Sequence, residues 1–120
     1  MGSIREAAVA GSFYPQDRAT LSGLLDTYIS QPNPQSIPPK ALIAPHAGYV
    51  YSGEIAGAAY TKILPRHGEI KRVVLLGPSH HVGFRGMALP TSQFFRTPLG
   101  DIPIDTDAIG QISKMKNVNY

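Results

Sequence analysis

Two short apolar segments set the strongest constraint on how this chain can fold. The first is 41–44, and the second is 73–76 within a predicted strand at 72–76. A segment that is apolar at consecutive positions, rather than at every second one, is typical of a strand covered on both faces. Between them, residues 52–64 form an alanine-rich helical pattern that ends before Pro65. Strand, helix and strand over this distance predict a right-handed βαβ unit with parallel strands, and therefore an α/β protein.

Weaker signals predict the remaining elements. Apolar residues at the spacing of one helical face predict a helix that ends before Pro32: Leu21, Leu24, Leu25, Tyr28 and Ile29. Residues 32–39 carry four prolines and are interpreted as a stiff connector inside a single domain, 1–120. Short strands are expected at 87–90 and 101–104.

The end of the chain is expected to carry a last helix. Asp105 is its predicted N-cap, and the helix should extend to about Lys116. Because a parallel sheet needs cover on both faces, two parallel strands with so few helices predict an incomplete fold. We therefore expect residues 1–120 to be the N-terminal portion of a larger α/β domain.

Each of the two apolar segments leads into histidine. His46 follows the first through Pro45, and His80 and His81 follow the second. The carboxyl ends of neighbouring parallel strands face a common crevice, and neutral imidazole is a ligand for iron, zinc and copper. Adjacent residues point in different directions, so His46 and His80 are the candidate metal ligands. His81 is a candidate for a role beside the metal or substrate, with packing as the alternative, and a hydrogen bond to a loop carbonyl is the alternative for His46.

No third metal ligand stands out. Catalytic zinc and non-haem iron sites use at least three protein ligands. Glu54 is the nearest carboxylate to the first histidine, but it is expected at the start of a helix, where the helix dipole already stabilises an acid. Ser79 lacks the Gly-x-Ser-x-Gly pattern of a nucleophile elbow, and His67 is expected in an exposed loop.

Composition narrows the classes of partner. Eleven Lys and Arg against eight Asp and Glu give a net charge of +3, and the basic residues are scattered, so no nucleic-acid partner is expected. The chain has no cysteine, which excludes a disulfide or thiolate metal site within it and favours a cytoplasmic location. The uncharged stretches are too short and too rich in Gly and Pro to span a bilayer, so no membrane association is expected.

Four motifs occur in order along the chain. They are Arg-Glu-Ala with Ala-Gly-Ser-Phe-Tyr-Pro at 5–15, Ala-Pro-His-Ala-Gly-Tyr at 44–49, Gly-Pro-Ser-His-His at 77–81, and Phe-Arg-Thr-Pro-Leu-Gly at 95–100. This combination resembles the Memo family, also called AmmeMemoRadiSam system protein B. The resemblance covers nearly the whole chain.

The resemblance implies a fold similar to that of the class III extradiol dioxygenases, which are α/β proteins with non-haem iron near the strand ends. It assigns His46 and His80 to the metal, Fe(II) first with copper or zinc as alternatives, and gives His81 the position after the second ligand. Members of the family are longer chains whose other site residues lie in the C-terminal part.

Two function classes follow from the resemblance. One is a metal-dependent, dioxygenase-like or redox enzyme acting on a small molecule, with His81 assisting proton transfer. The other is a non-catalytic module, as in a signalling adaptor, that binds a peptide or partner in the same crevice. A homo-oligomer is compatible with both.

Overall fold

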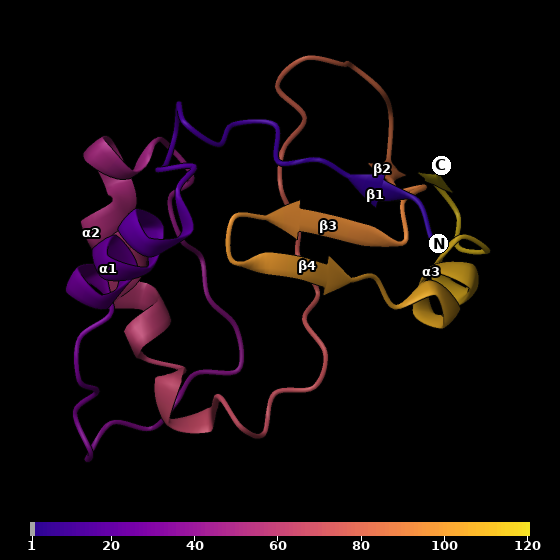
Figure 1. Cartoon of the computed structure of the whole chain (residues 1–120). Coiled ribbons are helices and arrows are strands. Elements are labelled where there is room, and N and C mark those ends of the chain that lie inside the picture. The colour runs from indigo at the N-terminus through magenta and orange to yellow at the C-terminus, as the bar shows by residue number, and fades with distance from the viewer. Residues whose placement is uncertain (1) are drawn as a thin grey trace. The chain divides into compact units, whose positions relative to one another are not determined.

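The computed structural model describes residues 2–120, which divide into two compact units. One unit combines the residues up to Ala8 with Leu75–Tyr120, and the other is Val9–Val74. Figure 1 shows the elements in chain order: β1 (Ile4–Arg5), α1 (Arg18–Tyr28), α2 (Tyr49–Thr61), a 3-10 turn η1 (Leu64–Arg66), β2 (Met87–Ala88), β3 (Phe94–Thr97), β4 (Gly100–Pro103), α3 (Thr106–Ile112) and β5 (Val118–Asn119). The chain is thus a mixed α/β structure that contains parallel strand pairs.

Helix α1 confirms the first predicted helix. It begins after Asp17, whose carboxylate accepts hydrogen bonds from the backbone N–H of Thr20 at 2.8 Å and from the Thr20 hydroxyl at 2.7 Å. This capping satisfies an N–H that has no partner within the helix, and it holds the pKa of Asp17 below its ordinary value. Leu21 on the apolar face is only 3% exposed and forms the core of the Val9–Val74 unit.

Helix α2 packs against α1 through residues with small side chains. A Cβ added to Gly57 would lie 2.5 Å from the carbonyl oxygen of Tyr28, and one added to Gly53 would lie 2.7 Å from the Tyr28 ring. The two buried hydroxyls of α2 are satisfied: Ser52 donates to the carbonyl of Ala47, and Thr61 donates to that of Gly57. Glycine at these positions allows the two helices to approach closely.

The three-stranded sheet has the order β1-β3-β4. β1 pairs with β3 in parallel, with Ile4 opposite Phe94, and β3 and β4 form an antiparallel hairpin. Gly100, which follows the hairpin turn, has a φ of 141°, a conformation that strongly favours glycine.

Arg96 of β3 joins the strands on both sides of it. Its Nε lies 2.9 Å from a carboxylate oxygen of Asp101 on β4, and another guanidinium nitrogen lies 2.9 Å from Glu6, directly after β1. Hydrogen bonds from this guanidinium lower the pKa of Asp101, and the positive charge of Arg96 lowers it further. Desolvation raises this pKa, but the net effect is a lowering. Two of the four sequence motifs, 5–15 and 95–100, therefore meet in one sheet.

The C-terminal elements are of the predicted types, but α3 is shorter than the predicted helix. Asp105 is the N-cap of α3, as predicted, and accepts from the backbone N–H of Ala108 at 3.0 Å. The helix ends at Ile112 rather than near Lys116. β2 and β4 confirm the two short strands expected at 87–90 and 101–104, and β5 pairs with β2 in parallel and buries Val118.

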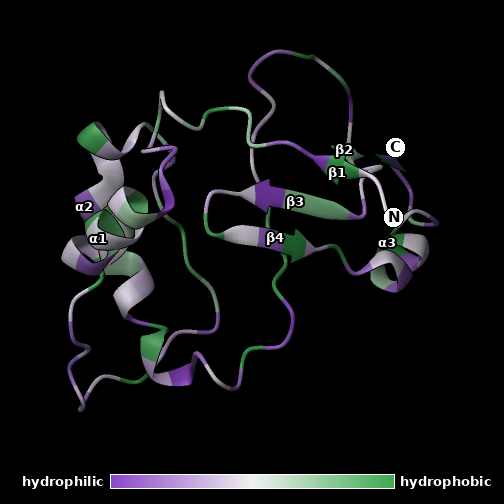
Figure 2. Ribbon diagram, in the orientation of Figure 1, coloured by the Kyte–Doolittle hydropathy of each residue, from purple (hydrophilic) through white to green (hydrophobic). Residues whose placement is uncertain are grey.

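The predicted parallel strands at 41–44 and 72–76 are not strands in this structure. Both segments run without regular secondary structure, and in Figure 2 apolar stretches on either side of α2 are drawn as plain tubes. The apolar pattern predicts burial, but a strand exists only where a neighbour accepts and donates its backbone hydrogen bonds. Within residues 2–120 these segments pair with none of the five strands, so the βαβ unit is not formed.

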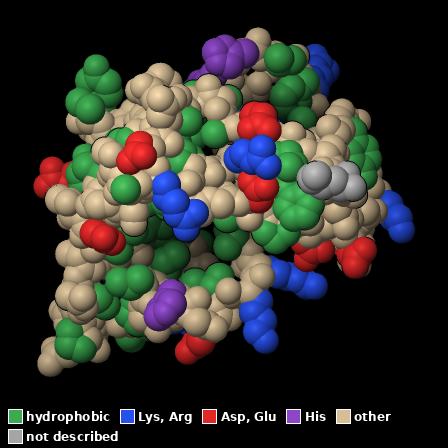
Figure 3. All heavy atoms as spheres, viewed as in Figure 1, with side chains coloured by type: hydrophobic (Ala, Val, Ile, Leu, Met, Phe, Trp, Pro, Cys, Tyr) green, Lys and Arg blue, Asp and Glu red, His purple; other side chains and the backbone are tan. Residues whose placement is uncertain are grey.

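The surface of the described residues carries no concentrated charge of one sign on the face shown in Figure 3, where Lys, Arg, Asp and Glu are interspersed. None of the helices found in residues 2–120 has both the length and the hydropathy needed to cross a bilayer. The proline-rich connector 32–39 lies inside the Val9–Val74 unit. The single-domain organisation stays a prediction.

Candidate functional site

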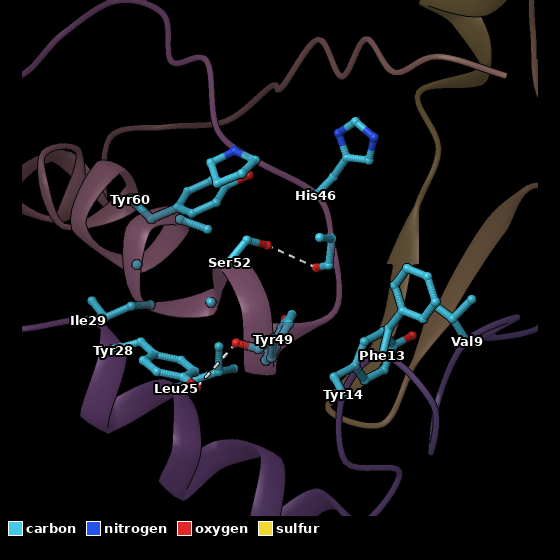
Figure 4. Close-up of a pocket in the computed structure, with 15 residues that line it drawn as sticks. Val9, Phe13, Tyr14, Leu25, Tyr28, Ile29, His46, Tyr49, Ser52 and Tyr60 are labelled. Carbon is cyan, nitrogen blue, oxygen red and sulfur yellow. Dashed lines mark hydrogen bonds between the residues drawn. The ribbon is translucent and has the colours of Figure 1, made fainter. Parts of the chain in front are cut away.

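A cavity of about 270 Å³ lies in the Val9–Val74 unit, among α1, α2 and the loops that precede each helix. Figure 4 shows it lined mainly by aromatic and aliphatic side chains. The rings that shape it come from Phe13, Tyr14, Tyr28, Tyr49 and Tyr60. An apolar cavity with a few polar groups is the usual form of a small-molecule site.

Two of the sequence motifs build this cavity together. The backbone N–H of Tyr49, at the start of α2, donates to the carbonyl of Phe13 at 2.8 Å. The Tyr14 and Tyr49 rings lie 5.5 Å apart between centroids, at an interplanar angle of 42°. The motif at 5–15 thus holds the Pro-His-Ala-Gly-Tyr motif in place, a contact that the sequence alone does not reveal.

Tyr49 is the centre of the aromatic cluster. The Tyr28 ring meets it edge-on at 6.3 Å, and the Tyr28 hydroxyl donates to the Tyr49 carbonyl at 3.4 Å. Burial raises the pKa of the Tyr49 phenol above its ordinary value, and the neighbouring phenols of Tyr14 and Tyr60 raise it further. Tyr49 is therefore neutral at physiological pH, which keeps this side of the cavity uncharged.

His46 lies at the rim of the same cavity. It follows Pro45 in the loop before α2, is exposed, and its ring stands apart from the tyrosine rings in Figure 4. The Ser52 hydroxyl donates to the carbonyl of Ala47 at 3.1 Å, which fixes the backbone directly after His46. The structure therefore places this histidine where it can face both solvent and a molecule in the cavity.

His80 and His81 lie in an exposed turn of the other unit. The Ser79 hydroxyl donates to the carbonyl of Val82 at 2.6 Å and accepts from its N–H at 3.3 Å, so it closes the turn that carries both histidines. This gives Ser79 a structural role, in agreement with the absence of a nucleophile elbow. That His46 and His80 share one metal ion stays a prediction, because they belong to different units.

The remaining polar candidates do not complete a site. In residues 2–120, no three His, Cys, Asp or Glu side chains come together in a group that could hold a metal ion. Glu54 lies in the middle of α2 rather than at its start, because the helix begins at Tyr49 and not at Ser52. Its side chain is exposed. His67 is exposed at the end of η1, as expected, with its Nδ1 2.9 Å from the carbonyl of Leu64.

Sequence reasoning missed the cavity residues of the first helix and of the segment before it. Tyr14 belongs to a motif that we used only for the family resemblance, and Tyr28 was assigned to the helix core. The available signal was the glycine pair of α2, Gly53 and Gly57, because such spacing on one helical face favours close packing against another element.

A family model described as "Memo-like protein" matches residues 5–120. This chain belongs to the Memo-like family. Over 110 residues, which are 92% of the chain, it is 44% identical to Protein MEMO1 of Xenopus laevis and 41% identical to Protein MEMO1 of Homo sapiens. It is 38% identical over 117 residues to a MEMO1 family protein of Aquifex aeolicus.

The Memo-like relatives are much longer than the matched part. The match covers 36% of the Xenopus laevis and Homo sapiens proteins and 42% of the Aquifex aeolicus protein. Family membership thus applies to nearly the whole of this chain, whereas the chain spans less than half of each relative.

Proposed function

We propose that this Memo-like chain supplies two imidazole ligands, His46 and His80, to a non-haem metal ion. Fe(II) is the first candidate, with copper and zinc as alternatives. The observation that carries the proposal is the position of His46 at the rim of an apolar, tyrosine-lined cavity. His80 enters through its matching sequence context, after an apolar segment and between glycines, which leave room for a bound group.

The described residues do not form a complete metal site. They offer two histidines without a third ligand beside them, whereas a catalytic metal site uses three or more protein ligands. We therefore assign the third ligand to polypeptide of the kind that the longer relatives carry outside the match. In a complete site the metal would supply activation of oxygen or of a bound substrate.

The chain's own residues would contribute binding and exclusion of water. The rings of Tyr14, Tyr28 and Tyr49 make an uncharged wall that suits a small aromatic or apolar molecule. His81, next to His80 in the exposed turn, is the group we propose for holding or moving a proton. We place this activity in the cytoplasm, where a chain without cysteine loses nothing to reducing conditions.

Anaerobic titration of the full-length protein with Fe(II), followed by calorimetry, tests the ligand assignment. His80→Ala is expected to abolish binding, because it removes one of the few protein ligands that hold the metal ion. His67→Ala is the matched control, since His67 is also an exposed histidine in a loop, and it should bind as the unchanged protein does. Equal loss in both variants would contradict the assignment.

A binding module is the second candidate, because the aromatic cavity lies within one unit and needs no metal for its shape. The cavity would accept an apolar or aromatic side chain of a peptide. The two candidates separate experimentally: metal-dependent oxygen consumption supports the enzyme, and peptide capture that persists in EDTA supports the module.

A further inference from the structure

A second cavity, of about 280 Å³, lies within the unit that contains Leu75–Tyr120. Its walls come from the loop between β2 and β3, from the segment that joins β4 to α3, from α3 itself and from the residue after β5. The α3 and β5 elements form the yellow end of the chain in Figure 1. None of the lining residues is a proposed metal ligand, so this cavity is separate from the proposed function.

The polar groups of this second cavity form hydrogen bonds but carry no charge. Three aliphatic hydroxyls, a phenol and an amide supply them: Thr91, Ser92, Thr106, Tyr120 and Gln93. Among the described residues that line the cavity, none is Lys, Arg, Asp, Glu or His. Within residues 2–120 none of these five side chains has a hydrogen-bond partner. Hydroxyls donate and accept, so they are available for a bound molecule.

Backbone hydrogen bonds hold the walls of the second cavity in place. The Ile104 N–H donates to the Gln93 carbonyl at 2.9 Å, which joins two of the walls. The Leu89 N–H donates to the Asn119 carbonyl at 2.7 Å and so fixes the backbone directly before Tyr120. The N-cap described above fixes the start of α3. Because the walls are already ordered, a ligand loses less free energy in ordering them on binding.

An apolar side and one aromatic ring complete the lining. Ile104 and Ile109 are half-buried and form the apolar side. Tyr120 is 68% exposed, so its ring is open to a ligand. A pyranose ring has an apolar face of C–H groups and a rim of hydroxyls. An aromatic ring beside uncharged hydrogen-bonding groups matches both parts of such a molecule.

We propose that the second cavity binds a neutral monosaccharide, with Tyr120 stacked on its C–H face and the Ser92 and Thr106 hydroxyls bonded to its hydroxyls. A charged ligand would lose hydration on entry and meet no opposite charge. A purely apolar ligand would cover the protein hydroxyls and leave them without partners. The volume lies at the lower end of the roughly 300–1,000 Å³ of small-molecule pockets, which suits one sugar and not a longer glycan.

Saturation-transfer NMR tests the proposal on the longest natural form that contains this sequence, with D-glucose, D-galactose and D-mannose as probes. EDTA is present throughout, so the result does not depend on the proposed metal site. We expect at least one of the three sugars to bind saturably, with a Kd on the order of millimolar for so small a ligand. The uronate of that sugar, in which a carboxylate replaces the CH2OH group, should bind about tenfold more weakly or not at all.

Two variants locate the bound sugar. Tyr120→Ala removes the stacking surface and should weaken binding about tenfold. Thr106→Val keeps the side-chain shape at an exposed position, removes one hydroxyl and should weaken binding about fivefold. Tyr51→Ala is the matched control, because Tyr51 is also an exposed tyrosine, at 86%, and does not line this cavity. It should bind the sugar as the unchanged protein does.

Unchanged far-ultraviolet circular dichroism shows that each variant is folded, and Thr106→Val decides the outcome if Tyr120→Ala does not fold. The proposal is overturned if none of the three sugars binds saturably, or if the uronate binds as tightly as its neutral sugar. It is also overturned if the folded variants of this cavity bind the sugar with the Kd of the unchanged protein.

Discussion

The contact between α1 and α2 predicts that alanine at position 57 destabilises the Val9–Val74 unit. A Cβ there would lie 2.5 Å from the Tyr28 carbonyl oxygen, 2.7 Å from its Cβ and 2.8 Å from its carbonyl carbon. Non-bonded heavy atoms pack at roughly 3.5–4.0 Å, so α2 must move away from α1 by about 1 Å. Two of these three Tyr28 atoms belong to the backbone, which cannot rotate away as a flexible side chain could.

Two opposing energies set the size of this effect. Overpacking of this kind costs about 1–3 kcal/mol, whereas replacing glycine with alanine inside a helix gains about 1 kcal/mol. At the middle of that range Gly57→Ala loses about 1 kcal/mol. Gly23→Ala in α1 is the matched control: no atom lies within 4 Å of its added Cβ, so it should gain about 1 kcal/mol.

Urea denaturation followed by far-ultraviolet circular dichroism measures both variants. We expect the free energies of unfolding to change in opposite directions and to differ by about 2 kcal/mol. If Gly57→Ala is as stable as Gly23→Ala, the close approach of α2 to Tyr28 is refuted, and with it the shape of the cavity.

Two further predictions concern protonation. The Arg96 hydrogen bonds depress the pKa of the Asp101 carboxyl, so this pair stabilises the fold above the ordinary aspartate pKa and loses its effect as the pH falls through the lowered value. A carboxyl NMR titration should show the Asp101 pKa rising in Arg96→Gln, and an unchanged pKa would rule out the pairing. Burial and the neighbouring phenols raise the pKa of Tyr49, so its stabilising effect persists below the ordinary tyrosine pKa and is lost as the pH rises through the raised one. Alkaline absorbance titration of Tyr49→Phe should lose a component that titrates above the ordinary tyrosine pKa, and an unchanged curve in that range would contradict the burial of this ring.

Local signals in the sequence predicted local structure well. Both helices with an Asp N-cap, at Asp17 and Asp105, occur where apolar spacing or capping chemistry indicates a helix. These features depend only on residues within a few positions of one another, which a single sequence displays directly.

Features that depend on distant residues could not be predicted. Strand β3 was not predicted, because it pairs with Ile4 and Arg5 about 90 residues away. Neither segment contains a sequence signal that indicates its partner. The strand expected at 72–76 is a wrong prediction, and its cause is a missing partner rather than a missing sequence signal. Its apolar sequence indicates burial, but the described residues contain no neighbour to pair with it. The sequence thus indicates which segments are suited to a buried sheet, and the structure shows which of them find partners.

The candidate site likewise combines features that are local in the sequence with features that depend on contacts between distant residues. Glycine and proline around His46 indicate an uncrowded loop, and the structure places that loop at the rim of a cavity. The cavity wall comes from Tyr14 and Tyr28, whose approach to Tyr49 follows from tertiary packing. The residues that line the cavity therefore follow from the packing of the helices and not from the sequence alone.

Metal content shows directly whether His46 and His80 are metal ligands. The longest natural form that contains this sequence should be loaded anaerobically with Fe(II), desalted and measured by inductively coupled plasma mass spectrometry, beside the His46→Ala/His80→Ala double variant. We expect about one metal ion per chain in the unchanged protein, as for a single ligand set, and none in the double variant. Metal retained by the double variant, or absent from both proteins, would contradict this assignment.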